Sequence, residues 1–234
     1  MHRERVALFR RYDDLWRQAF VDFRRGTCSA DAHLAGCLPD DRWGVTLLAR
    51  LPESLRLRLA PTRSEMESVF HHQYLVPEPD LHITCLSVEP VRSGYSPEAS
   101  QIVAIVDAVE EALVGYEPFG IEIEGLGASS SALFACGYPC DEALNAFRDR
   151  LRQCCRRRGV GMDADRRYVL RGAHVTLLRF ATANITDTQM RWLEDRRLYP
   201  GGRHQLSEIV LVEHDWYNRA TTAVTHHRWH LPRA

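Results

Sequence analysis

The chain has 234 residues, of which 45% are hydrophobic and 26% are charged, so a sizeable core can form without disulfides or metals. The formal net charge of −1 excludes a molecule-wide field that draws the protein to nucleic acid or membrane. All 30 basic residues are arginines, which excludes a Walker-type lysine and a Schiff-base lysine.

The seven cysteines match no zinc-site spacing, and we find neither a signal peptide nor an apolar run long enough to span a bilayer. We therefore expect a reduced, cytoplasmic protein whose thiols act as small hydrophobic side chains. The expected organisation is an N-terminal amphipathic helix and linker over 1–41, followed by a single domain over 42–234. Residues 3–25 predict that helix, which we expect to dock on the core through apolar residues at helical spacing. These residues are Val6, Phe9, Trp16, Phe20 and Phe23.

The first half of the domain predicts alternating strands and helices. These are a strand over 43–51, a helix over 52–72, a strand over 81–90 and a helix over 96–115. Pro61 can break the first of these helices. In the second, Ser96 is the expected N-cap and Pro97 the first helical residue.

The second half repeats this theme. Strands are predicted over 119–126, 131–139, 173–181, 205–217 and 220–231, and helices over 141–159 and 186–197. The segment "GASS" at 127–130 predicts a hairpin turn, and Gly159 is the expected C-cap of its helix. In each half, a strand–helix–strand unit thus ends with a strand that contains the pattern His-x-Thr. We expect two pseudo-symmetric α+β lobes with mainly antiparallel sheets that line a central cleft.

The two His-x-Thr patterns are "LHITCL", with His82 and Thr84, and "AHVTLLRF", with His174 and Thr176. Residues i and i+2 of a strand point to the same face, so each pattern places an imidazole beside a hydroxyl. Paired imidazoles can act as general base and general acid near neutral pH, and the hydroxyls can donate hydrogen bonds to phosphate oxygens. Such a site needs no metal. Because about one such pattern is expected by chance, a pair of core histidines with satisfied hydrogen bonds is the simpler alternative.

These two motifs resemble those of the two-histidine (2H) phosphoesterase superfamily, which includes RNA 2′,3′-cyclic phosphodiesterases and proteins called 2′-5′ RNA ligases. The resemblance covers roughly 43–231 and omits the N-terminal helix. It implies a bilobal fold and a metal-independent phosphoric diester hydrolase without a cofactor. Its substrate would be a cyclic or 2′-linked phosphodiester of a nucleotide or RNA end. His82, Thr84, His174 and Thr176 would be the catalytic residues. A catalytically silent relative that binds nucleotide or RNA is the alternative.

Two further features bear on the site. Ten arginines lie between Arg148 and Arg179, and they predict either a phosphate-binding rim or a solvated helix face. In a regular strand, Arg179 faces away from Thr176, three residues earlier. The C-terminal histidines 226, 227 and 230 raise the possibility of a metallohydrolase. However, residues 226 and 230 of a strand lie about 13 Å apart, too far to chelate one ion, so we expect no metal.

Overall fold

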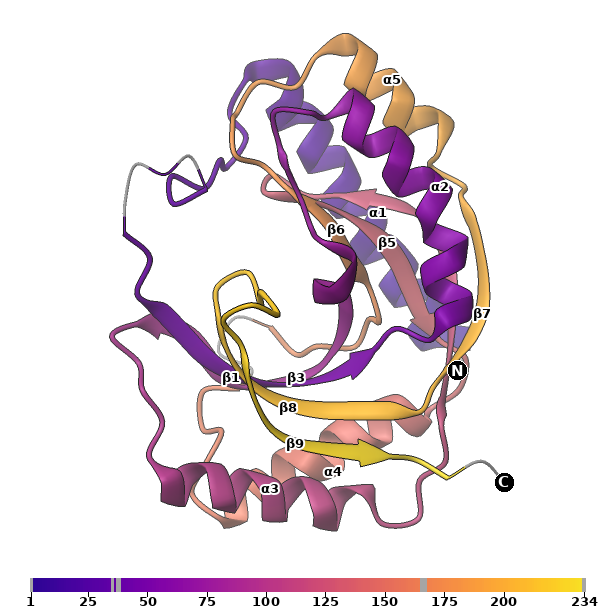
Figure 1. The fold of residues 1–234 in the computed structure, drawn as a ribbon. Coiled ribbons are helices and arrows are strands. Elements are labelled where there is room, and N and C mark those ends of the chain that lie inside the picture. Colours follow the sequence, from indigo (N-terminus) through magenta and orange to yellow (C-terminus); the bar gives the residue numbers. More distant parts are fainter. Residues whose placement is uncertain (1, 35, 37–38, 165–167, 233–234) are drawn as a thin grey trace.

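The computed structural model describes residues 2–34, 36, 39–164 and 168–232. Within these residues, nine strands form one curled sheet with the order β7-β4-β5-β6-β3-β1-β8-β9, and β2 pairs with β6 (Figure 1). The strands are β1 (Arg42–Arg50), β2 (Tyr74–Leu75), β3 (His82–Ser93), β4 (Phe119–Ala128), β5 (Ala132–Pro139), β6 (Val175–Arg179), β7 (Pro200–Leu206), β8 (Glu208–Asp215) and β9 (Val224–His230). The helices are α1 (His2–Arg25), α2 (Glu53–Val69), the short 3-10 helix η1 (Glu78–Asp80), α3 (Ala99–Leu113), α4 (Ala143–Arg157) and α5 (Asp187–Asp195).

Two groups of four antiparallel strands, together with the short β2, make up the sheet. The strands β7, β4, β5 and β6 form one group, and β3, β1, β8 and β9 form the other. The groups meet where β3 and β6 pair antiparallel, with Ile83 opposite Val175. The predicted α+β fold with mainly antiparallel sheet and an N-terminal helix is confirmed, and both expected halves contribute strands to the same continuous sheet. The boundary at residue 42 stays a prediction.

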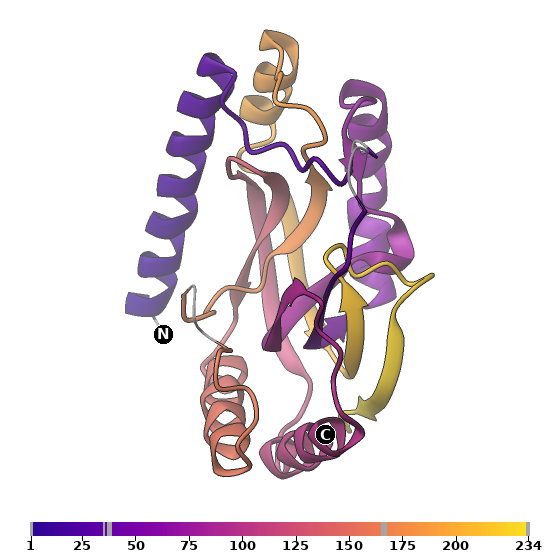
Figure 2. The same ribbon diagram turned by 90° about the vertical axis from the view of Figure 1, so that its left-hand side faces the viewer.

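Helices cover the sheet at both ends and along one side. Figure 1 shows α3 and α4 together below the strands and α2 beside α5 above them. Figure 2 shows α1 along one side of the sheet, where it contacts β4 and β5. No helix among the described residues combines the length and the apolar character needed to cross a bilayer.

The helix α1 docks on the core as predicted, although through a different set of side chains. Phe20 and Phe23 are buried as expected, but Phe9 is 56% exposed. Leu8 and Tyr12 are buried instead and form a small cluster with Phe134, Cys136 and Tyr138 of β5. The docked face therefore runs through Leu8 and Tyr12, one residue before and three after Phe9.

Three predicted boundaries were wrong. The helix α2 continues through Pro61, because core residues pack on both sides of the proline. The helix α3 begins at Ala99, since Glu98 still has extended backbone, and neither Ser96 nor Pro97 is helical. The predicted strand 205–217 is two strands, because the chain leaves β4 after Leu206 and pairs with β1 from Ile209 onward.

Candidate active site

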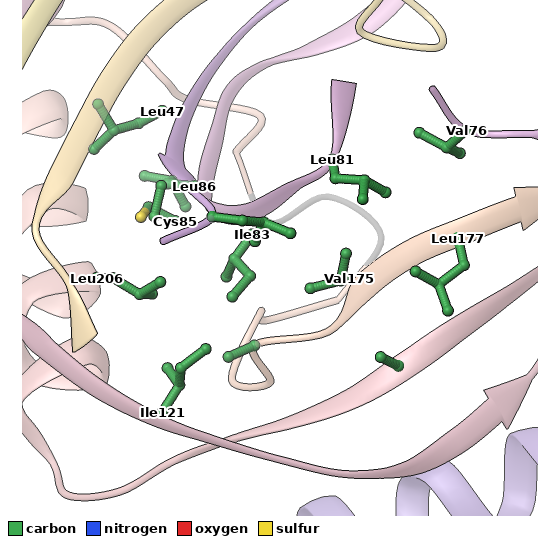
Figure 3. Close-up of a cluster of buried hydrophobic side chains, with 14 of the residues drawn as sticks. Leu47, Val76, Leu81, Ile83, Cys85, Leu86, Ile121, Val175, Leu177 and Leu206 are labelled. Carbon is green, nitrogen blue, oxygen red and sulfur yellow. The ribbon is translucent and has the colours of Figure 1, made fainter. Parts of the chain in front are cut away.

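The pairing of Ile83 with Val175 determines where both motifs point. These two side chains are fully buried and extend into the same hydrophobic cluster (Figure 3). Because neighbouring residues of a strand point to opposite faces, residues 82, 84, 174 and 176 project from the other face of the sheet. All four are half-buried, unlike the fully buried residues between them.

The antiparallel register also determines which of the four groups are neighbours. The antiparallel pairing of Ile83 with Val175 puts His82 on the same side of this pair as Thr176, and Thr84 on the same side as His174. Directly opposed residues of antiparallel strands have Cβ atoms about 4.5–5.5 Å apart. The two imidazoles therefore lie at opposite corners around the Ile83–Val175 pair, and the two hydroxyls lie at the other two corners.

Hydrogen bonds orient the imidazole of His82. Its Nδ1 lies 2.7 Å from the carbonyl oxygen of Asp80, so Nδ1 carries the proton and donates it to that oxygen. The amide nitrogen of Asn218, itself an N–H donor, lies 3.1 Å from the same nitrogen, so the carbonyl oxygen of Asp80 is the acceptor that orients the ring. With Nδ1 held in this way, Nε2 is the nitrogen that can exchange a proton with a substrate.

His174 lies beside a cavity of about 590 Å³. Both His174 and Thr176 line this cavity, and the ring of Phe134 contacts the imidazole of His174 edge-on at 5.5 Å between ring centres. His82 and Thr84 are not among the lining residues. The sheet thus brings the four predicted residues to one face, and the cavity extends from the second motif toward α1.

Burial lowers the pKa of both motif histidines from 6.5 to about 4. At His174, the positive charges of Arg148, Arg179 and Arg11 add to this effect. At His82, the hydrogen bond to Asp80 opposes the effect of burial, whereas His214, Arg50 and Arg179 add to it. Both imidazoles are therefore neutral at pH 7 without a ligand. A bound phosphodiester anion would raise both pKa values again, since opposite charge favours the protonated form.

The prediction that Arg179 faces away from the motif was wrong. Between Phe134↔Thr176 and Leu133↔Leu178, the register of β5 with β6 skips Leu177, which is a β-bulge. The extra residue reverses the alternation, so Arg179 points to the same face as Thr176 and lines the same cavity. Its guanidinium lies over the ring of Trp216, at 5.7 Å from the ring centre.

Most of the other predicted rim arginines have structural partners. Arg148 is fully buried and donates to the carbonyl oxygens of Thr84, Cys85 and Gly172 at 2.7–2.9 Å and to Asn145 Oδ1 at 3.0 Å. It therefore ties the first motif strand to the segment that precedes His174. The arginines 157 and 158 pair with Glu111, and residues 166 and 167 lie outside the described part of the chain.

Sequence reasoning missed two residues on this side of the sheet. Asn218, with φ of 56°, lies beside Nδ1 of His82. His214 of β8 is buried, with Nε2 2.8 Å from Thr46 Oγ1 and Nδ1 2.6 Å from the carbonyl oxygen of Asp215. Both residues come from the segment 214–218, and no local pattern there signals contact with a strand more than 130 residues earlier.

The C-terminal histidines are engaged otherwise. His226 Nε2 lies 3.0 Å from Glu213, and the ring of His227 contacts that of Trp229 in a tilted arrangement. Among the described residues, no group of three or more histidine, cysteine, aspartate or glutamate side chains is arranged to hold a metal ion.

Comparison with known proteins decides the family. A model of the 2′-5′ RNA ligase superfamily matches residues 51–218, which include both motifs. The chain belongs to this superfamily. No match was found among curated proteins.

Several solved structures have the same fold as this chain. LigT of E. coli, complexed with 3′-AMP, matches with a TM-score of 0.59 and 16% identity over 82% of this chain and 99% of LigT. TT0787 of Thermus thermophilus matches with a TM-score of 0.62 and 15% identity over 81% of this chain and 98% of TT0787. At these identities, the likeness is one of fold.

Proposed function

We propose that this protein is a metal-independent phosphodiesterase that hydrolyses a cyclic or 2′-linked phosphodiester of a nucleotide or RNA end. The observation that carries the proposal is the register of β3 with β6, which sets two imidazoles and two hydroxyls on one face around the Ile83–Val175 pair. In-line displacement at phosphorus needs a base on one side and an acid on the other, and a diagonal pair of imidazoles suits this demand.

In the proposed reaction, one histidine removes a proton from water, and the water oxygen forms a bond to phosphorus. The bond from phosphorus to the ribose oxygen breaks, and the other histidine gives its proton to that oxygen. Thr84 and Thr176 donate hydrogen bonds to the non-bridging oxygens, and Arg179 balances their charge. After one turnover the acid has lost a proton and the base has gained one, so exchange with solvent restores both.

The neutral state of both histidines at pH 7 fits this scheme once the substrate is included. A base must be neutral, and an acid must be protonated. The negative charge of the phosphodiester raises the pKa of the nearer imidazole, so that substrate binding favours protonation of the histidine that acts as the acid. Superfamily membership supports the same chemistry. LigT, which shares the fold, has been solved in complexes with 3′-AMP, ATP and NADP+, and these complexes support a nucleotide as the substrate class.

The test is hydrolysis of nucleoside 2′,3′-cyclic phosphates and 2′,5′-linked dinucleotides in excess EDTA, followed by phosphorus NMR of the products. We expect turnover in EDTA, and the product, a 2′- or 3′-phosphate, identifies the leaving oxygen. Activity that EDTA abolishes and a divalent metal restores would refute the metal-independent mechanism. If nucleotides bind but none is hydrolysed, the protein is the silent binding relative instead.

A further inference from the structure

The helix α1 supplies one wall of the cavity beside His174. Leu8, Arg11 and Leu15 line it from the same face of the helix, and Phe134 and Tyr168 also line it. The superfamily match begins at residue 51, so this wall lies outside the matched residues. Contacts that α1 makes with a ligand would therefore be additional to those of the matched region.

The arginines around the cavity fall into two groups. The first group is neutralised by acids. Arg5 contacts Glu122 and Glu124 at 2.9 and 2.6 Å, and Arg171 contacts Asp149 at 2.8 Å. Because these guanidinium groups already have carboxylate partners, they offer little to an anionic ligand.

The second group consists of Arg11 and Arg179. Among the residues that the structure describes, no hydrogen bond or ion pair joins either of them to a carboxylate. Each instead lies over an aromatic ring, Arg11 at 4.6 Å from the ring centre of Tyr168 and Arg179 at 5.7 Å from that of Trp216. Stacking holds the plane of a guanidinium without using its N–H donors, so both arginines can form bidentate hydrogen bonds with a phosphate.

Two arginines, Arg11 and Arg179, are more than a phosphodiester requires, because a phosphodiester carries a single negative charge. Arg179 is on the motif strand itself, beside Thr176, and suffices for the reacting phosphate. Arg11 lines the same cavity from α1 and is exposed to solvent. A free phosphate monoester carries about two negative charges at pH 7 and matches a guanidinium fork.

We propose that Arg11 binds a second phosphate group of the substrate, so that the preferred substrate is a nucleotide that carries a phosphate monoester besides the reacting phosphodiester. This inference rests on the proposed function, since it takes the reacting group to lie at the two motifs. The apolar and aromatic side chains between Arg11 and His174, such as Leu8 and Phe134, line the space left for the nucleoside.

The test measures equilibrium binding and needs no turnover. Calorimetric titration with adenosine 3′-phosphate and adenosine 3′,5′-bisphosphate gives the ratio of their dissociation constants. We expect the wild-type protein to bind the bisphosphate at least about tenfold more tightly. Arg11→Ala should lower this ratio below about two, and Arg11→Lys should keep part of it. Arg10→Ala is the matched control, because Arg10 is exposed on the same helix and does not line the cavity, and its ratio should equal that of the wild type.

The outcomes separate the two proposals. Equal affinities in the wild type, or a preference that survives Arg11→Ala, would overturn the role of Arg11 and leave the proposed function standing. If neither nucleotide binds to the wild-type protein, the nucleotide-directed function fails, and the role of Arg11 fails with it. Because Arg11 is exposed, Arg11→Ala should unfold at the wild-type temperature, which circular dichroism verifies.

Discussion

Arg148 is the residue whose replacement most sharply tests how the site is held together. Its guanidinium is fully buried without a carboxylate partner among the described residues, and it donates to three backbone carbonyls and one amide oxygen. Arg148→Met keeps the length of the side chain and removes all of these donors. The carbonyl oxygens of Thr84 and Gly172 then lose the bridge that joins the two motif segments.

The magnitude follows from two opposing contributions. Each buried acceptor left without a donor costs about 1–3 kcal/mol, so four of them cost about 8 kcal/mol if each lies in the middle of that range. Burial lowers the pKa of Arg148 from 12.5 to about 10, which corresponds to about 3 kcal/mol that the variant no longer loses by burying a charge. We therefore expect Arg148→Met to lower the free energy of unfolding by about 5 kcal/mol.

Urea unfolding followed by circular dichroism measures this loss, and Arg156→Met, an exposed position on the same helix, is the control. Under conditions in which Arg148→Met is still folded, its kcat should be about tenfold to a hundredfold lower than that of the wild type, because small displacements of catalytic groups are costly. Its KM should change little. A loss of stability below about 1 kcal/mol, or an unchanged kcat, would refute the account of Arg148 as the link between the motifs.

Three further predictions concern the motifs and their surroundings. Because the pKa values of His82 and His174 are about 4 in the folded protein and about 6.5 in the unfolded chain, only the unfolded chain gains these protons as pH falls from 6.5 to 4. The contribution of these histidines to the free energy of unfolding should therefore be complete above pH 6.5 and should fall by up to about 3 kcal/mol per histidine toward pH 4. In denaturant titrations at several pH values, replacing either histidine by alanine should reduce this dependence on pH. Replacing Thr84 or Thr176 by valine should lower kcat at least about tenfold with nearly unchanged stability, and a steady-state assay that shows equal kcat would exclude hydrogen bonding of these hydroxyls in the transition state. Arg179→Met should raise KM at least about tenfold, and the effect should shrink at high salt if the contact with phosphate is electrostatic.

The parts of the site that the sequence could predict are those that depend on local geometry. The two-residue period of a strand relates His82 to Thr84 and His174 to Thr176 without any knowledge of the fold. The repeat of strand, helix and motif strand indicates that both motifs lie in equivalent places. Hydrogen bonding between β3 and β6 then brings them together, and that pairing is visible in the structure alone.

The parts that could not be predicted depend on long-range register. The bulge at Leu177 is a shift in the register between β5 and β6, and this shift reverses the direction of the Arg179 side chain. Likewise, Asn218 reaches His82 through the turn after β8, where its positive φ places the amide next to Nδ1. The contribution of α1 to the cavity depends on how that helix docks on β5, and helical spacing alone did not distinguish Leu8 from Phe9.

The most direct test of the central claim compares the wild-type protein with His82→Ala and His174→Ala in the hydrolysis of a 2′,3′-cyclic nucleotide in EDTA. His230→Ala, an exposed histidine outside the cavity lining, is the control. If the histidines act as base and acid, each single replacement lowers kcat at least about a hundredfold, while the control matches the wild type and nucleotide affinity persists. Full activity in either motif variant would contradict the account.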